Sequence, residues 1–353
     1  MPGPLEGVHV LEFAGIGPAP FACMILADYG ADVVQICRPG TSDSDVMTRG
    51  RTKVEVDLKA QGSVEFIHSM VASADVLIEG FRPGVMERLG IGPAELLDVN
   101  PKLIYGRMTG YGQDGPMAKE AGHDINYIAI AGVLDNMRRT GDKPLFPMNL
   151  VGDMGGGGML IALGVLAALT SVQTTGRGQV VDAAMIEGAS LLGTMFHELQ
   201  AQGTWIEPGT NLLDSGAHFY EVYETSDNKF MAVGAIESQF YDALLRKLNL
   251  DPSQFPQYDR QRWPEFKKQF VEIFKSRTRD EWTDLFAGAE ACTTPLLSMQ
   301  EAKAHEQHTA RTGFVELNGV SVPAPAPRFS ETPATVRESR RLSQAEALDA
   351  WST

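Results

Sequence analysis

"VHVLEFAGIGPAPFACMILADYGADVVQIC", residues 8–37, decides the fold class because it places a helical pattern between two β-branched runs. The runs at 8–14 and 32–37 predict strands. The segment between them, 20–31, predicts a helix that ends with Gly30 as its C′ residue. Strands that alternate with helices in this way are typical of a parallel sheet with crossover helices. We therefore expect an α/β fold.

The same alternation continues along the chain. Further strand candidates are "KVEVDL" (53–58), "DVLIEG" (75–80), "LIYGRM" (103–108) and "GQVVDAAM" (178–185). Together they predict a Rossmann-like large domain over 1–188 that is completed by residues from about 325–353.

The first turn of this domain lacks a dinucleotide fingerprint. Gly15 and Gly17 follow the first strand, but Pro18 and Pro20 stand where the fingerprint has a third glycine and free amides. A nicotinamide or flavin site is therefore not expected.

A smaller α+β domain is expected over 218–312, joined by linkers at 189–217 and 313–324. The stretch 219–237 reads as two alternating strands that turn at Asp227 and Asn228. After it, Phe266, Phe270, Ile273 and Phe274 form one apolar helical stripe, which predicts core packing.

Composition limits the partners and the cellular setting. The net charge of -15 argues against nucleic acid or an acidic membrane surface as the main partner, because both require a positive field. Cys23, Cys37 and Cys292 show no metal-ligand or disulfide spacing, so we expect no metal site and a reducing, cytoplasmic setting. The apolar helix candidate at 159–169 has about half of the ~20 residues that span a bilayer and should be a core helix.

Asp153 is the first candidate for chemistry, because it precedes four consecutive glycines, 155–158, that lead into the core helix. Amides at a helix start carry partial positive charge and can hold an oxyanion. The alternative is that Asp153 is an N-cap and that the glycines only permit close packing.

His123 and Asp124 begin an otherwise apolar run, "AGHDINYIAIAGV" (121–133). An imidazole titrates near neutrality and is a natural proton carrier beside a substrate, although a lone histidine is more often structural. Asp124 can cap the helix or tune the site by hydrogen bonding. Adjacent helical residues diverge by about 100°, so the two side chains are not expected to reach one carbon together.

Glu237 closes the apolar strand of the smaller domain, where it either serves a site or caps the next helix.

Basic side chains also cluster at or just after the early strands, at the edge where open α/β sheets bind ligands. They suit a phosphorylated ligand and comprise Arg38, Arg49, Arg51, Lys53, Lys59, Arg82 and Arg88.

Several motifs resemble the α-methylacyl-CoA racemases of the family III CoA-transferase fold. They are the opening 5–40 and "GHDINYIAIAGV", "NLVGDMGGGGM", "GRGQVVDAAM", "EPGTNLLDSGAHFYEVYET" and "FMAVGAIESQFY". The likeness runs in unbroken order from about residue 3 to 330. It implies a cofactor-free racemase that inverts the α-carbon of 2-methylacyl-CoA thioesters.

The resemblance also assigns roles to residues. His123 and Asp153 are the two bases on opposite faces of the substrate carbon, and Glu237 reaches the site from the small domain of a partner in an interlocked homodimer. CoA and substrate contacts are assigned to Arg38, Val56, Asp57, Leu58, Lys59, Gly80, Phe81, Arg82, Arg88, Gly122, Ile125, Asn126 and Tyr127.

Two rival functions remain at this point. In a CoA transferase of the same fold the aspartate at position 153 is a nucleophile. A non-catalytic acyl-CoA binding protein would keep the arginines without needing His123, Asp153 and Glu237 together. His123 favours the racemase, because a transferase needs no second base across the α-carbon.

Overall fold

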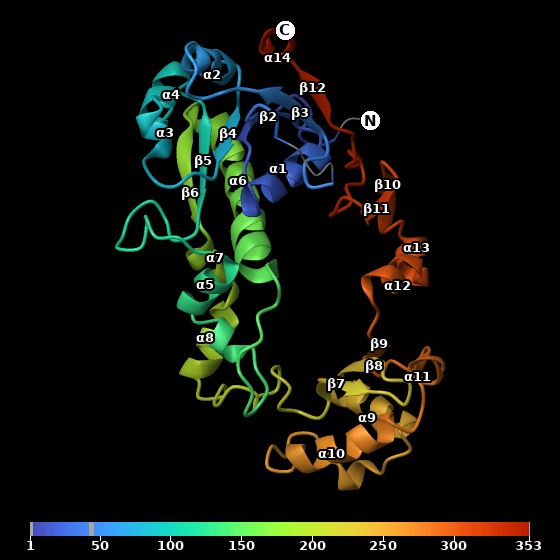
Figure 1. Ribbon diagram of the computed structural model, residues 1–353. Helices are drawn as coiled ribbons and strands as arrows, with labels where there is room; N and C mark the ends of the chain where they lie inside the picture. Colours follow the sequence, from blue (N-terminus) through green and yellow to red (C-terminus); the bar gives the residue numbers. More distant parts are fainter. Residues whose placement is uncertain (1–2, 42–45, 353) are drawn as a thin grey trace. The chain divides into compact units, whose positions relative to one another are not determined.

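The computed structural model describes residues 3–41 and 46–352 (Figure 1). The chain divides into two compact units. Unit 1 comprises Met1–Gly132, Pro147–Gly193 and Glu306–Thr353, and unit 2 comprises Val133–Phe146 and Thr194–His305. Unit 2 therefore takes a short segment from within the N-terminal half of the chain, which the sequence pattern did not indicate.

Unit 1 contains a seven-stranded parallel sheet in the order β12-β3-β2-β1-β4-β5-β6. Its strands are β1 (His9–Phe13), β2 (Asp32–Cys37), β3 (Arg51–Glu55), β4 (Val76–Glu79), β5 (Ile104–Thr109), β6 (Gln179–Ala184) and β12 (Arg340–Leu342). The order reverses at β1, which lies between β2 and β4. The expected Rossmann-like α/β architecture is thus confirmed, and its ligand crevice belongs at the carboxyl ends of β1 and β4.

Helices cover both faces of this sheet, because neighbouring strand residues point to opposite sides. Val10 packs with α1 (Pro18–Asp28) and α6 (Leu160–Thr175). Leu11 belongs to the core of the other face, which is built with α2 (Ser63–Val71), α4 (Pro93–Val99) and α14 (Gln344–Trp351). Further α-helices of unit 1 are α3 (Val85–Arg88), α5 (Asp124–Ile130), α7 (Met185–Leu192) and α13 (Glu306–Ala310).

The segment that returns from unit 2 is more ordered than a linker. Residues 313–324 were expected to be a linker, yet β10 (Phe314–Leu317) and β11 (Val320–Pro323) pair there as an antiparallel hairpin. Asn318 and Gly319, with φ of 50° and 76°, supply the left-handed backbone that a two-residue hairpin turn requires. Beyond this hairpin, the Trp351 ring of α14 stacks on the His9 ring of β1, with the ring centroids 4.8 Å apart.

Unit 2 contains an antiparallel sheet of β7 (Tyr220–Glu224), β8 (Phe230–Gly234) and β9 (Thr293–Pro295). The predicted hairpin over 219–237 is confirmed, as is the aromatic helix stripe, whose three phenylalanines are fully buried. The helical segments are η1 (Leu134–Asn136), α8 (Thr194–Ala201), α9 (Ser238–Lys247), η3 (Pro252–Gln254), α10 (Trp263–Phe274), α11 (Arg279–Phe286) and α12 (Met299–Ala304).

The apolar core helix is longer than expected. A π-helical segment, η2 (Leu150–Met159), continues into α6, and the resulting 26 residues are long and apolar enough to cross a membrane by length and composition. Ile161 and Val165 nevertheless pack in the core against the sheet. The helix is therefore part of the layered domain, and the expectation from 159–169 alone was wrong about its length.

Candidate functional site

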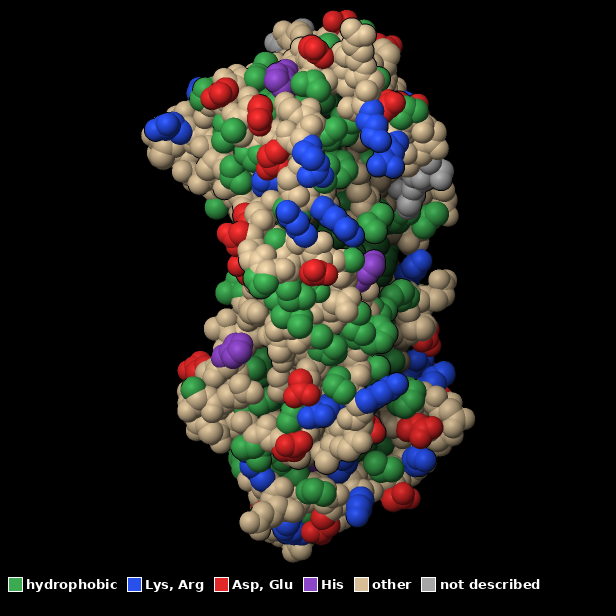
Figure 2. All heavy atoms as spheres, turned by 60° about the vertical axis from the view of Figure 1, so that its left-hand side comes forward, with side chains coloured by type: hydrophobic (Ala, Val, Ile, Leu, Met, Phe, Trp, Pro, Cys, Tyr) green, Lys and Arg blue, Asp and Glu red, His purple; other side chains and the backbone are tan. Residues whose placement is uncertain are grey.

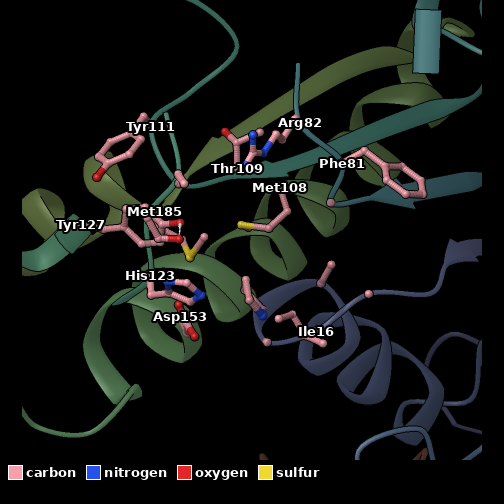
Figure 3. Close-up of a pocket in the computed structure, with 18 of the residues that line it drawn as sticks. Ile16, Phe81, Arg82, Met108, Thr109, Tyr111, His123, Tyr127, Asp153 and Met185 are labelled. Carbon is pink, nitrogen blue, oxygen red and sulfur yellow. Dashed lines mark hydrogen bonds between the residues drawn. The ribbon is translucent and has the colours of Figure 1, made fainter. Parts of the chain in front are cut away.

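A cavity of about 660 Å³ lies at the switch point of the sheet (Figure 3). Its walls come from the segments that follow β1, β4 and β5, and from α5, η2 and α7. The residues that line it include Gly15–Ala19, Gly80–Pro83, Met108–Tyr111, Gly122, His123, Tyr127, Asn149, Asp153, Met154 and Met185. This is the position at which open α/β sheets bind ligands.

His123 is the N-cap residue of α5, with extended backbone at φ -136°. Its main-chain N–H donates to Oδ1 of Asn126 at 3.1 Å, and its carbonyl accepts from the amide of Asn126 at 2.8 Å. These bonds fix the backbone of His123 while its exposed imidazole remains on the cavity wall. The ring is thus held at its base and open to a ligand.

Asp153 lies in the first turn of η2 and is half-buried. Its Oδ2 accepts from Nδ2 of Asn149 at 2.8 Å. Burial raises the pKa of the Asp153 carboxyl, the Asn149 bond and the His123 charge lower it, and the Asp124 charge raises it. Figure 3 shows His123 and Asp153 close together on one side of the cavity. Two groups 30 residues apart in sequence therefore meet at one cavity.

The glycines after Asp153 lie inside the helical segment, because it already begins at Leu150. A Cβ on Gly156 would lie 2.7 Å from the amide nitrogen of Ala189, and one on Gly188 would lie 1.9 Å from the carbonyl oxygen of Gly156. The glycines thus let η2 pack directly on α7. The expectation that they form an anion-binding helix start was wrong. Of the alternative, the close packing of the glycines is correct, but Asp153 is not the N-cap residue, which is Asn149.

Asp124 is the first residue of α5 and is only 2% exposed. Its Oδ2 accepts from the main-chain N–H of Asp153 at 2.7 Å. Asp124 therefore caps η2 rather than its own helix, whose N-cap residue is His123.

Tyr127 shapes the backbone that leads to His123. Its hydroxyl donates to the carbonyl of Gly122, and its ring fills the space where a Cβ on Gly110 or Gly122 would lie, at 2.2 and 2.7 Å. Burial, with smaller contributions from Tyr111, Asp153 and Asp124, raises the pKa of Tyr127 to about 12, although the Arg82 charge acts to lower it. Tyr127 thus remains protonated near neutrality and donates this bond.

Glu237 belongs to unit 2 and is described within that unit. It is the N-cap residue of α9, and its carbonyl accepts from the amides of Phe240 and Tyr241 at 3.0 Å. Its side chain is exposed and makes no cap hydrogen bond. The position caps the helix through its backbone, so the carboxylate is not used for capping.

The residues expected to contact CoA are distributed unevenly. Gly80, Phe81 and Arg82 line the cavity, and so do Gly122 and Tyr127. Exposed side chains that do not line it are Arg38, Asp57, Lys59, Arg88, Ile125 and Asn126. Leu58 is half-buried against the core, and Val56 is buried in it, so Val56 can offer a ligand only its backbone.

Three members of the expected basic cluster are buried, which corrects that expectation. Arg51 pairs through Nε with Glu12 at 2.9 Å, and both side chains are fully buried. Arg49 pairs with Asp28 at 2.5 Å, and Lys53 is 4% exposed within β3. These cations belong to the interior of the sheet. The exposed cluster reduces to Arg38, Lys59, Arg82 and Arg88.

Several cavity residues were not singled out in the sequence. They are Ile16, Met108, Tyr111, Met154 and Met185. Ile16 was within reach of prediction, because it stands between Gly15 and Gly17 directly after the first strand. Among residues 3–41 and 46–352 no group of three or more His, Cys, Asp or Glu side chains is placed to hold a metal ion.

Comparison with known proteins identifies the family. The chain belongs to CoA-transferase family III, whose sequence profile matches residues 5–340. Alpha-methylacyl-CoA racemase of Mus musculus is 46% identical over 346 residues, covering 97% of this chain and 91% of the relative. The Homo sapiens protein of that name is 43% identical over 334 residues, covering 94% and 87%. A CAIB/BAIF family protein from Brucella suis shares the fold, with a TM-score of 0.85 and 22% identity over 99% of both chains.

Proposed function

We propose that this member of CoA-transferase family III is an α-methylacyl-CoA racemase that interconverts (2R)- and (2S)-2-methylacyl-CoA thioesters. The observation that carries the proposal is the meeting of His123 and Asp153 at one cavity of the sheet switch point. The identities of 46% and 43% to racemases over nearly the whole chain support it. The proposed reaction transfers only protons, so it requires no cofactor. CoA enters as part of the substrate.

Inversion proceeds by two proton transfers through an enolate. One base removes the α-proton from one face, and the conjugate acid of the other base delivers a proton to the opposite face. Neutral imidazole with protonated Asp153 acts on one epimer, and imidazolium with ionised Asp153 acts on the other. Each turnover converts one protonation state of the pair into the other, so protons balance over a forward and a reverse turnover.

The environment of Asp153 suits this exchange of roles. An ordinary imidazole titrates about two units or more above an ordinary carboxyl group, so the proton would otherwise favour the ring. Burial raises the pKa of Asp153 and so brings its two protonation states closer in energy to those of an imidazole. Both protonation states of the pair then become accessible, as racemisation in both directions requires.

The enolate oxygen needs hydrogen-bond donors, which are typically worth 10²- to 10³-fold each. The glycine-rich segment does not offer them as a helix start, because those glycines pack on α7. We assign this part to the main-chain N–H groups of Asp124 and Ile125, which follow His123 and precede the first main-chain hydrogen bond of α5, from the amide of Asn126 to the carbonyl of His123.

The CoA moiety binds at the exposed cations near the strand ends. Arg82 lines the cavity, and Arg38, Lys59 and Arg88 are exposed, which suits phosphate groups. We expect Arg82→Ala to raise KM for CoA thioesters about tenfold, as one lost charge-assisted contact does, while kcat is retained. Arg177→Ala, exposed ahead of β6 at the opposite edge of the sheet, is the matched control. An equal effect of both variants would argue against this assignment.

The active enzyme is an interlocked homodimer in which Glu237 completes the site of the partner subunit. Unit 1 presents exposed apolar side chains on neighbouring helices, and Figure 2 shows hydrophobic side chains gathered on the side of α5 and α7. The exposed apolar side chains of α5, η2, α6 and α7 include Ile125, Ile130, Met159, Leu163, Leu191 and Leu192. Such a face is typical of a subunit interface.

We assign the enzyme to the cytoplasm, which is consistent with three free cysteines.

One assay separates the racemase from its rivals. A single 2-methylacyl-CoA epimer is incubated in deuterated water, with and without an acceptor carboxylate. Epimerisation with α-deuterium uptake in the absence of acceptor supports the racemase. CoA exchange that depends on the acceptor, without α-deuterium, would instead support a transferase, in which Asp153 would be the candidate nucleophile. Binding without either reaction would leave only an acyl-CoA binding protein.

A further inference from the structure

Asp124 is a buried carboxylate that the proposed chemistry does not use directly. Its Oδ2 accepts the main-chain N–H of Asp153 at 2.7 Å, whereas its Oδ1 is buried without a hydrogen-bond partner among residues 3–41 and 46–352. A buried carboxylate with one oxygen unsatisfied is costly to stability. A neutral acceptor would make the same single bond at lower cost, so a use for the charge itself is expected.

The chain makes room for this bond. A Cβ on Gly152 would lie 2.7 Å from Oδ2 of Asp124, so a side chain at 152 would have to displace the carboxylate. The amide of Asp153 is available because the helical bonds of η2 start one residue later, where Met154 N–H donates to the carbonyl of Asn149 at 3.2 Å. Sequence and helix geometry thus both provide for the contact.

The contact joins the two bases through consecutive residues. His123 supplies one base, and Asp124, the next residue in the chain, holds the backbone of the other base. The path from the backbone of His123 to the backbone of Asp153 runs through one peptide unit, the Asp124 side chain and one hydrogen bond. The spacing between the imidazole and the Asp153 carboxylate therefore depends on this bond.

We infer that Asp124 is a positioning residue that sets Asp153 against His123 across the substrate α-carbon. The inference rests on the proposed racemase function and deepens it. A displacement of about 1 Å at a reacting group costs on the order of 10²-fold in rate. Loss of the contact should therefore impair proton transfer on the Asp153 face more than on the His123 face.

The Asp124 charge has a second effect, because it raises the pKa of Asp153. Asp124 and His123 face Asp153 from α5, and Asn149 bonds to it from its own segment. The other titratable or charged side chains on the cavity wall are Tyr127, Tyr111, Arg82 and Glu120. Neutralising Asp124 should lower the pKa of Asp153, so the acid limb of the inversion profile should move to lower pH.

Two variants separate position from charge. Asp124→Asn keeps a carbonyl oxygen for the Asp153 amide and removes the charge, whereas Asp124→Ala removes both. Each is assayed in deuterated water with each epimer, following inversion and α-deuterium uptake. We expect Asp124→Ala to lose about 10²-fold of inversion. It should still deuterate with retention the epimer whose α-proton faces His123. Asp124→Asn should invert far better than Asp124→Ala, with its acid limb at lower pH.

Asp75→Ala is the matched control, because its carboxylate accepts a distant main-chain N–H, that of His9 at 2.8 Å, outside the cavity. Equal loss of exchange on both faces in Asp124→Ala, or an unchanged acid limb in Asp124→Asn, would overturn the inference. If wild-type enzyme shows no inversion at all, the proposed function itself fails. If His123→Ala and Asp153→Ala abolish inversion while both Asp124 variants match wild type, only the role of Asp124 fails.

Discussion

The two helix starts that border the cavity, α5 and η2, position the proposed acid/base groups by different means. At α5 the functional residue is the N-cap residue itself, and local bonds to Asn126 fix its backbone. At η2 the functional residue lies within the first helical turn, and long-range packing of glycines on α7 fixes the segment. One of the proposed bases is thus positioned by its neighbours in sequence and the other by the tertiary fold.

This difference has a consequence for robustness. A local cap is a single contact worth on the order of 1 kcal/mol, and its loss disturbs few other residues. A close helix crossing involves backbone on both sides, so an added methyl group must move a whole segment. We therefore expect damage at η2 to affect folding and damage at α5 to affect mainly the site.

The largest expected effect comes from removing either base. His123→Ala and Asp153→Ala should each lower inversion by on the order of 10²- to 10⁴-fold, because neither group can replace the other on the opposite face. Each variant should retain α-deuterium exchange for the epimer whose proton faces the surviving base. Chiral analysis together with mass spectrometry measures both. If one variant inverts at the wild-type rate, its residue is not a base, whatever the structure of its helix start.

Gly188→Ala tests the packing of η2. Its Cβ would lie 1.9 Å from the carbonyl oxygen of Gly156, so we expect a loss of about 3 kcal/mol in the free energy of unfolding. Urea unfolding measures this loss. Gly155→Ala is the matched control, because its nearest contacts lie at 3.2 Å. Similar stability of the two variants would show that the close crossing does not hold η2.

Asn126→Ala is the corresponding change at α5. It removes the acceptor of the His123 N–H and should cost about 1 kcal/mol of stability. Inversion should fall a few-fold, because the imidazole loses part of its anchor. Asn126→Asp places a carboxylate oxygen where the Asn126 amide oxygen accepts the His123 N–H, and it should recover most of the rate. A stability loss as large as that of Gly188→Ala would contradict the contrast between the two helix starts.

Asp153→Asn has the smallest expected effect on stability, and its sign is informative. Burial raises the pKa of Asp153 in the folded chain above the ordinary value of 3.8, which applies to the unfolded chain. At a pH between the unfolded-state pKa and the higher folded-state pKa, the folded chain therefore binds more protons than the unfolded chain. The free energy of unfolding therefore falls as the pH rises through that window. We expect Asp153→Asn to be more stable than the parent at pH 7, with a gap that narrows as the pH falls.

Urea unfolding between pH 7 and pH 4 measures the gap, and Asp98→Asn, exposed on α4, controls for the loss of one charge. A gap that is independent of pH would show that Asp153 does not titrate abnormally.

Local patterns in the sequence were sufficient to predict most of the sheet and to single out His123 and Asp153, the two proposed bases, as candidates. The β-branched runs gave six strands of the large sheet, and the positions of His123 and Asp153 beside helix starts indicated the site. β12 was not predicted, because three residues at an edge carry no periodic pattern.

Features that depend on distant residues were predicted wrongly or not at all. Arg49 and Arg51 look like surface cations in sequence, but Asp28 and Glu12 pair with them inside the domain. In the sequence, the glycines of η2 look like a helix start. Their packing partner, Gly188 on α7, is more than 30 residues away, so the sequence pattern does not reveal the close crossing. The bond from Asp124 to the Asp153 amide likewise spans 29 positions.

A crystal structure with a bound 2-methylacyl-CoA tests the central claim most directly. The imidazole of His123 and the carboxylate of Asp153 should each lie about 3.5 Å from the substrate α-carbon, on opposite faces. If both groups approach the same face, or if either one points away from the thioester, racemisation by this pair is contradicted.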